Sequence, residues 1–313
     1  MVKLEHLVKE FGARRAVDDI SFQVEKGTVL GFLGPNGAGK TTTIRMVAGY
    51  LIPTSGRALV EGCDVALDPV RAQKQIGYMP ENAPLYEEMT VEGFLRFVAE
   101  LRGFTGAALA ERVSAVMASC FLRPVRSQII DTLSKGYRQR TSFAQALLHD
   151  PPVLLLDEPT EGLDPNQKQV VREMIRGMGK EKIIILSTHV LEEVEAICSR
   201  VIIISKGRIV ADSTPDQLKK RSRYRNILTV ELRAGRDEAV AAFRAVGDVE
   251  GVEVLDSEEG RPRLRLLPRR QQPLAVSALE VARSHNWPVL GLETDSGHLD
   301  DVFRELTITE DVG

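Results

Sequence analysis

Residues 133–159 read LSKGYRQRTSFAQALLHDPPVLLLDEP, and the apolar run at 153–156 predicts a buried strand that ends in two carboxylates. These are Asp157 and Glu158. A metal-dependent phosphoryl-transfer site needs such a pair, because one carboxylate holds Mg²⁺ and the other handles the attacking water. The alternative is two charges at a strand end that only face solvent. That reading does not explain why Pro159 and an EGLD stretch follow directly.

A second stretch, GPNGAGKT at residues 34–41, fits GxxxxGK[ST] at every fixed position. It follows the apolar run TVLGFL and precedes a helical pattern, so backbone N–H groups and a helix N-terminus can surround phosphate oxygens. Lys40 is expected to reach the β- and γ-phosphates, and the Thr41 hydroxyl is placed to bind Mg²⁺. This motif alone indicates a nucleoside triphosphate and no particular reaction. The predicted phosphate-binding residues are Gly34, Pro35, Asn36, Gly37, Ala38, Gly39, Lys40, Thr41 and Thr42.

Further motifs occur in a fixed order and resemble those of the ABC ATPase family over about residues 1–215. Residues 133–137, LSKGY, resemble the family's signature sequence, although LSGGQ is the common form. Residues 161–164, EGLD, resemble its D-loop, and His189 in STHVLEE resembles its switch histidine. Phe11 matches the aromatic A-loop position. The resemblance implies an α/β P-loop NTPase (ABC ATPase) domain with a helical subdomain.

The resemblance also implies roles for single residues. Glu158, His189 and Lys40 would be catalytic, and Phe11 would stack on adenine, although an ordinary core aromatic remains the alternative for Phe11. Ser134 is also a good N-cap for the helix that follows. The family's head-to-tail dimer implies that Ser134 and Gly136 close over a γ-phosphate held by another copy. The remaining residues that the resemblance assigns to nucleotide or Mg²⁺ are Glu81, Asp157 and Asp164, with Thr41, Glu81 and Asp157 as the metal ligands.

Two positions depart from the family pattern. Residues 76–82 read IGYMPEN, so Glu81 stands where glutamine is usual. A carboxylate only accepts hydrogen bonds, whereas glutamine also donates. We expect Glu81 to keep a role on the metal side of the site. Lys135 stands where glycine is common, and a solvated helix start is favoured over a cation that faces phosphate.

Composition describes a globular protein of 313 residues with 43% hydrophobic and 27% charged residues. A net charge of −3 gives no electrostatic reason to expect a nucleic-acid partner. Three cysteines without a CxxC pair suit a reducing compartment. The N-terminus lacks the apolar segment of a signal peptide, and no run reaches the ~18 apolar residues of a membrane span.

The chain is expected to divide near the basic run at 219–225, KKRSRYR. We predict an ABC ATPase domain at 1–220, with a largely parallel sheet and a helical subdomain at about 85–135. An accessory domain is expected at 225–313. Its β-α-β-β-α-β pattern followed by a terminal helix resembles a small α+β ferredoxin-like unit.

The resemblance implies an ATPase subunit of a multi-subunit ABC transporter, most like ABC-2 exporter and gliding-motility-type subunits. ATP and Mg²⁺ are the expected cofactors. The expected partners are transmembrane permease subunits and a second copy of the chain, at the cytoplasmic side of the cell membrane. The alternative is a soluble ABC ATPase without a transport role, in which residues 225–313 bind a regulator.

Overall fold

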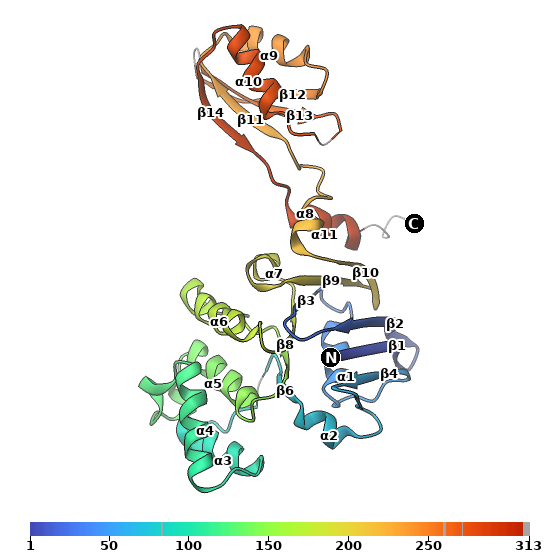
Figure 1. The fold of residues 1–313 in the computed structure, drawn as a ribbon, viewed down its shortest axis with the longest axis vertical. Helices are drawn as coiled ribbons and strands as arrows, with labels where there is room; N and C mark the ends of the chain where they lie inside the picture. The colour runs from blue at the N-terminus through green and yellow to red at the C-terminus, as the bar shows by residue number, and fades with distance from the viewer. Residues whose placement is uncertain (83, 259–260, 271, 309–313) are drawn as a thin grey trace. The chain divides into compact units, whose positions relative to one another are not determined.

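The computed structural model describes residues 1–82, 84–258, 261–270 and 272–308, and its chain forms two compact units. The first unit runs from Met1 to Pro215, and the second begins at Asp216. None of the helices among the described residues combines the length and apolar composition that crossing a membrane requires. Figure 1 shows the elements of each unit along the chain.

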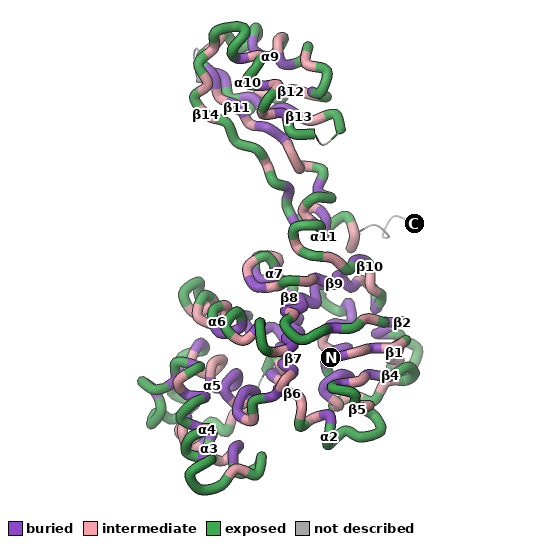
Figure 2. The backbone as a smooth tube through the Cα atoms, viewed as in Figure 1, coloured by how far each residue is buried: buried purple, intermediate pink, exposed green. Residues whose placement is uncertain are grey.

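The first unit is built around a six-stranded sheet in the order β10-β9-β3-β8-β7-β6. The five strands from β9 to β6 pair in parallel, and β10 pairs antiparallel with β9. Every residue of β3, β7 and β8 is buried, and the purple tube at β7 and β8 in Figure 2 shows this burial. One face of the sheet packs against helices, and the other packs against α1 (Lys40–Val47) and the strands of a second sheet. The strands are β3 (Val29–Leu33), β6 (Ile76–Met79), β7 (Val153–Asp157), β8 (Ile183–Thr188), β9 (Arg200–Ser205) and β10 (Arg208–Ser213).

This unit also contains a second sheet, which the sequence analysis did not predict. It is antiparallel, in the order β2-β1-β4-β5, and its long hairpin β1–β2 carries three register shifts. Each bulge interrupts the alternation of apolar and polar residues, so the sequence period of two is lost there. Its strands are β1 (Val2–Phe11), β2 (Arg14–Val24), β4 (Ser55–Val60) and β5 (Cys63–Asp64).

Helices surround the parallel sheet and form a separate helical region where the sequence predicted one. In that region Phe94, Leu95 and Val113 pack with Phe143 in one hydrophobic core that continues to the sheet residue Leu154. The helices of the unit are α1 (Lys40–Val47), α2 (Pro69–Lys74), α3 (Val91–Leu101), α4 (Gly106–Ser119), α5 (Lys135–Leu147), α6 (Pro165–Met178) and α7 (Leu191–Ile197), and α8 (Pro215–Lys219) spans the boundary between the units.

The second unit contains the β-α-β-β-α-β order that the sequence pattern predicts, followed by a helix. Its sheet is antiparallel in the order β12-β13-β11-β14, which is the strand order of a split βαβ unit. Leu228, Val230 and Leu232 alternate into a core with Phe243 of α9. The elements are β11 (Leu228–Leu232), α9 (Arg236–Arg244), β12 (Val249–Glu258), β13 (Arg261–Pro268), α10 (Ala275–Ser284), β14 (Val289–Thr294) and α11 (Leu299–Ile308).

Candidate active site

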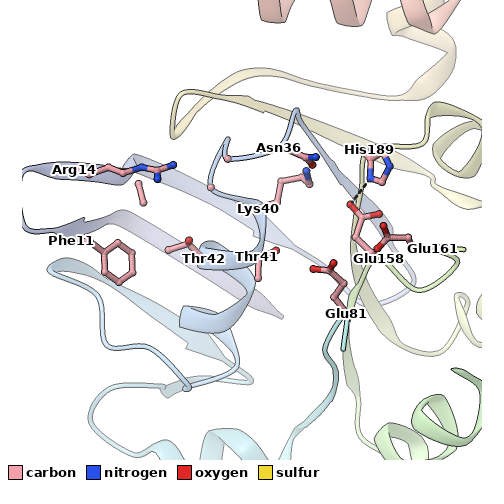
Figure 3. A pocket seen from close by; sticks show the side chains of 13 residues that line it. Phe11, Arg14, Asn36, Lys40, Thr41, Thr42, Glu81, Glu158, Glu161 and His189 are labelled. Atoms are coloured by element: carbon pink, nitrogen blue, oxygen red, sulfur yellow. Dashed lines mark hydrogen bonds and ion pairs between the residues drawn. The ribbon is translucent and has the colours of Figure 1, made fainter. Parts of the chain in front are cut away.

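The carboxyl ends of the parallel strands bring the sequence motifs together. β3 leads into the glycine-rich loop, β7 ends at Asp157, and β8 leads to His189. Parallel strands end at the same edge of a sheet, so motifs that lie more than a hundred residues apart share one pocket. Figure 3 shows their side chains around this pocket.

The glycine-rich loop is packed against neighbouring backbone. A Cβ atom on Gly39 would lie 2.5 Å from the carbonyl oxygen of Ala16, and one on Gly34 would lie 2.5 Å from that of Ile204. Gly39 also has a φ of +107°, which side-chain-bearing residues rarely adopt. The loop therefore leaves its N–H groups at the start of α1, where a helix N-terminus favours an anion.

Lys40 is the buried cation of this loop, with 7% of its surface exposed. Its Nζ donates to the carbonyl oxygens of Gly34 at 2.7 Å and Pro35 at 3.3 Å. Burial lowers the pKa of the Lys40 ammonium, while nearby carboxylates, first that of Glu158, oppose the shift. A phosphate group would offer this ammonium a stronger acceptor than the two carbonyls.

Asp157 lies at the bottom of the site and is fully buried. Its Oδ1 atom lies 3.2 Å from the Thr41 hydroxyl and also accepts from the Ser187 hydroxyl. Its Oδ2 atom is buried and has no hydrogen-bond partner in the part of the chain that the structure describes. Carboxylate and hydroxyl oxygens are the ligands that Mg²⁺ prefers, and a buried carboxylate oxygen without a partner needs a cation or water. Asp157 and Thr41 therefore fit a Mg²⁺ ion bound together with phosphate.

Glu158 and His189 form the polar pair next to this carboxylate. His189 Nδ1 lies 2.9 Å from Glu158 Oε1. Glu158 is nearly buried, and its backbone has a φ of +48°, an uncommon conformation for a residue with a side chain. Its N–H donates to the Ser187 carbonyl and hydroxyl oxygens, both at 3.2 Å, which fixes this conformation. One carboxylate oxygen of Glu158 thus stays available beside the position of an attacking water.

A cavity of about 430 Å³ is bordered by Lys40, Thr41, Glu158 and His189, whereas the fully buried Asp157 is not among its lining residues. Phe11, whose exposed fraction is 49%, lies on its wall, which removes the alternative that Phe11 is a core residue. Arg14, Ala16 and Glu161 also border the cavity, although the sequence analysis did not assign them to the site. Recognition of the β1–β2 turn would have indicated Arg14, since the turn brings this cation close to Gly37. The lining is Phe11, Arg14, Ala16, Asn36, Gly37, Gly39, Lys40, Thr41, Thr42, Glu81, Glu158, Glu161 and His189.

Glu81 follows β6 and lies on the wall of the cavity, as its sequence position predicts. Partial burial raises the pKa of the Glu81 carboxyl, and the carboxylates of Glu161 and Asp157 raise it further. The negative charges of these carboxylates therefore repel one another. A divalent cation would relieve this repulsion.

The signature residues Ser134 and Gly136 and the D-loop residue Asp164 do not border this cavity within a single chain, whereas Glu161 of the D-loop does. The Ser134 hydroxyl caps α5 by accepting from the N–H of Tyr137 at 3.4 Å. Asp164 caps α6 by accepting from the N–H of Gln167 at 2.9 Å. A Cβ on Gly136 would lie 2.6 Å from the end of the flexible Gln167 side chain and would displace it.

Lys135 is exposed, in agreement with the interpretation of a solvated helix start. Its Nζ also lies over Gly162 of the same chain, where an added Cβ would be only 1.9 Å away. Gly34, Pro35 and Ala38 shape the loop and do not border the cavity.

Comparison with known proteins assigns the chain to a family. The model of the family described as "ABC transporter" matches residues 17–161. The probable multidrug ABC transporter ATP-binding protein YbhF of Escherichia coli is 38% identical over 71% of this chain, which spans only 38% of that protein's length.

Two relatives match along almost the whole chain. The linearmycin resistance ATP-binding protein LnrL of Bacillus subtilis is 30% identical over 98% of each chain. The daunorubicin/doxorubicin resistance ATP-binding protein DrrA of Streptomyces peucetius is 33% identical over 98% of this chain and 92% of its own length. A solved ATP-binding subunit of an ABC transporter has 32% identity and a TM-score of 0.64 over 71% of this chain and 92% of that one. The chain belongs to the family of ABC transporter ATP-binding proteins.

Proposed function

We propose that this chain is the ATP-hydrolysing subunit of a multi-subunit ABC exporter. The observation that carries the proposal is the pair Asp157–Glu158 at the end of β7, which faces the glycine-rich loop while Glu158 contacts His189 at 2.9 Å. This arrangement combines a phosphate site, a cation site and a base in one cavity.

The residues around Asp157 bind and neutralise the triphosphate in this proposal. Asp157 and Thr41 would hold Mg²⁺, which would supply positive charge where the transferred phosphoryl group becomes more negative. Lys40 leaves the carbonyls of Gly34 and Pro35 to donate to the β- and γ-phosphates. Phe11 stacks on the adenine at the mouth of the cavity.

Glu158 acts as the base that orients the attacking water and accepts its proton. His189 holds one oxygen of Glu158 and contacts the γ-phosphate from the other side. Glu81 stands near the water and the cation and keeps the metal-side role expected from its position. Its repulsion with Glu161 falls when the cation binds, so Glu81 responds to the occupancy of the site.

A second copy of the chain completes the site. Ser134 is exposed at the start of α5, Gly136 is buried in its first turn, and neither borders its own chain's cavity. We assign them to the γ-phosphate held by the second copy, with Asp164 near the same interface. A capped helix start with a glycine is a suitable anion site. Within one chain the loop at residues 34–41 already binds the phosphates, so the start of α5 is available to the phosphate of another copy.

Transport follows from the relatives that span almost the whole chain. LnrL and DrrA are named for resistance to linearmycin and to daunorubicin and doxorubicin, and export of a compound is a direct route to resistance. We therefore propose export, with transmembrane permease subunits as partners and a peripheral position at the cytoplasmic side of the membrane. These full-length matches favour transport over a soluble role, and residues 225–313 are proposed as an accessory domain.

The test compares the same change, glutamate to glutamine, at two positions that line the cavity. Glu158→Gln removes the base and keeps the shape, so we expect turnover to fall by about 10²–10⁴-fold while ATP still binds. Glu81→Gln is the matched control, and we expect it to retain substantial ATPase activity. Phosphate release measures turnover, and equilibrium dialysis measures ATP binding. Unchanged turnover in Glu158→Gln, or an equal loss in both variants, would refute the assigned roles.

A further inference from the structure

The second unit has a cleft that the nucleotide site does not use. Its volume is about 600 Å³, and its walls come only from residues between Tyr224 and Arg304. Small-molecule sites commonly measure ~300–1,000 Å³. One wall is the face of the sheet opposite the core, and another is the first half of α11.

The sheet wall carries two arginines that lie two residues apart on one strand. Arg263 and Arg265 alternate with the buried Leu264 along β13, so both point to the face opposite the core. Two residues of strand separate their backbones by about 7 Å. Arg304 of α11 adds a third guanidinium to the cleft.

These guanidinium groups have unused donors. Arg263 lies 3.9 Å from Glu293, and Arg265 lies 3.6 Å from Glu253, both too far for a hydrogen bond. Within the described ranges, Arg304 makes no hydrogen bond or ion pair. Each guanidinium carries five N–H donors in a planar fork that matches phosphate or carboxylate oxygens.

Four carboxylates line the cleft, and two of them are hydrogen-bonded within their own chain. Asp295 accepts from the Gly297 N–H at 2.8 Å, and its other oxygen lies 3.0 Å from His298 Nε2. Asp301 accepts from the Ser222 hydroxyl at 3.4 Å. Glu293 lies 3.9 Å from Arg263 without a hydrogen bond, and Asp300 has no partner in the described chain, so the three guanidinium groups face two carboxylates that are not hydrogen-bonded.

The remaining hydrogen-bonding capacity of the cleft is therefore mainly that of donors. Apolar surface from Ile227 and Leu255 and the ring of Tyr224 also border it, which suits the carbon part of an organic ligand. Backbone hydrogen bonds hold two segments of the cleft wall together. The N–H of Asn226 donates to the carbonyl oxygen of Asp295, and the N–H of Asp295 donates to that of Ile227, both at 2.8 Å.

We propose that this cleft binds a free organic diphosphate, with Arg263 and Arg265 as the phosphate-binding residues and Arg304 as a third contact. Phosphate matches the guanidinium fork, and two phosphoryl groups match two neighbouring arginines. A concave cleft of this size suits a small molecule, whereas a lipid surface would present the same phosphate chemistry on a flat face. The ligand differs from the ATP of the proposed catalytic site and needs none of its residues.

The test titrates pyrophosphate into the full-length Lys40→Ala chain without divalent metal and measures heat of binding. The Lys40→Ala background weakens the other phosphate site. We expect saturable binding that weakens by at least about tenfold when Arg263 and Arg265 are both changed to Gln. Arg261→Gln, on the same strand and face but outside the cleft, is the matched control and should bind normally.

Arg304→Gln tests the opposite wall and should also weaken binding, which keeps the test valid if the double variant fails to fold. Equal affinity in the cleft variants and in the Arg261→Gln control would overturn the proposal, as would an absence of saturable binding. A parallel arm uses vesicles of phosphatidylcholine with phosphatidic acid. Binding to vesicles that pyrophosphate does not compete for would assign the arginines to a membrane surface and overturn the free ligand.

Discussion

Replacement of Gly39 by alanine should distort the phosphate loop, and the structure gives the size of the effect. The new Cβ would meet the Ala16 carbonyl oxygen at 2.5 Å, and the φ of +107° is unfavourable for any L side chain. A side-chain-bearing residue in such a conformation costs about 1–3 kcal/mol, and the clash with backbone adds to that cost. We expect Gly39→Ala to lower the free energy of unfolding by this amount and to weaken ATP binding.

The matched control is Gly177→Ala, because Gly177 lies in the last turn of α6 and an added Cβ would meet nothing within 4 Å. This change should stabilise the chain by about 0.5–1 kcal/mol. Urea unfolding and equilibrium ATP binding give both quantities. The reasoning would be refuted if Gly39→Ala unfolded at the same urea concentration as Gly177→Ala, or if it bound ATP as tightly as the unmodified chain.

Two further predictions concern buried ionisable groups. Arg172 donates at 2.9 and 2.7 Å to Glu193, whose side chain is 1% exposed. Arg172→Ala should therefore lower the free energy of unfolding, measured in urea, by about 3–5 kcal/mol. Replacing both residues by apolar ones should recover most of this loss, and a double variant that is equally unstable would contradict the reasoning. Burial lowers the pKa of His149 to about 4. The unfolded chain binds the proton first, so stability should fall as the pH drops from about 6.5 to 4. His149→Gln should reduce this slope, and an unchanged slope would refute the prediction.

The sequence predicted those parts of the site that local patterns determine. The motif at residues 34–41 predicts a phosphate-binding loop without reference to the rest of the chain. Asp157 and Glu158 follow an apolar run, and a buried strand there places them at the edge of a sheet. His189 follows β8 in the same way. In each case the functional residue directly follows a strand in the sequence. One short segment therefore determines both where the side chain lies and which functional group it brings.

Other parts depend on pairing between distant segments. Arg14 reaches the cavity only because β1 and β2 form a hairpin, whose bulges hide the strand alternation. Glu161 was identified as part of a motif, but its place on the cavity wall depends on the turn after β7. Arg263 and Arg265 can be assigned to the cleft only when the pairing of β13 with its neighbouring strands is known. The sequence RLRLL alone does not show which face of the sheet is covered.

The claim that a second copy completes the site has a direct test by complementation. Ser134→Asp keeps a good helix N-cap but places a negative charge against phosphate, and Ser134→Asn is the neutral control with the same capping ability. Glu158→Gln chains keep Ser134 but lack the base. Each variant alone should hydrolyse little ATP.

The decisive measurement is ATP hydrolysis by a mixture of Ser134→Asp and Glu158→Gln chains. In a mixed pair, the intact Glu158 of one copy meets the intact Ser134 of the other, so one complete site forms. The account predicts that mixing restores hydrolysis well above the average of the separate variants. Hydrolysis equal to that average, or full activity of Ser134→Asp by itself, would contradict a site shared between two copies.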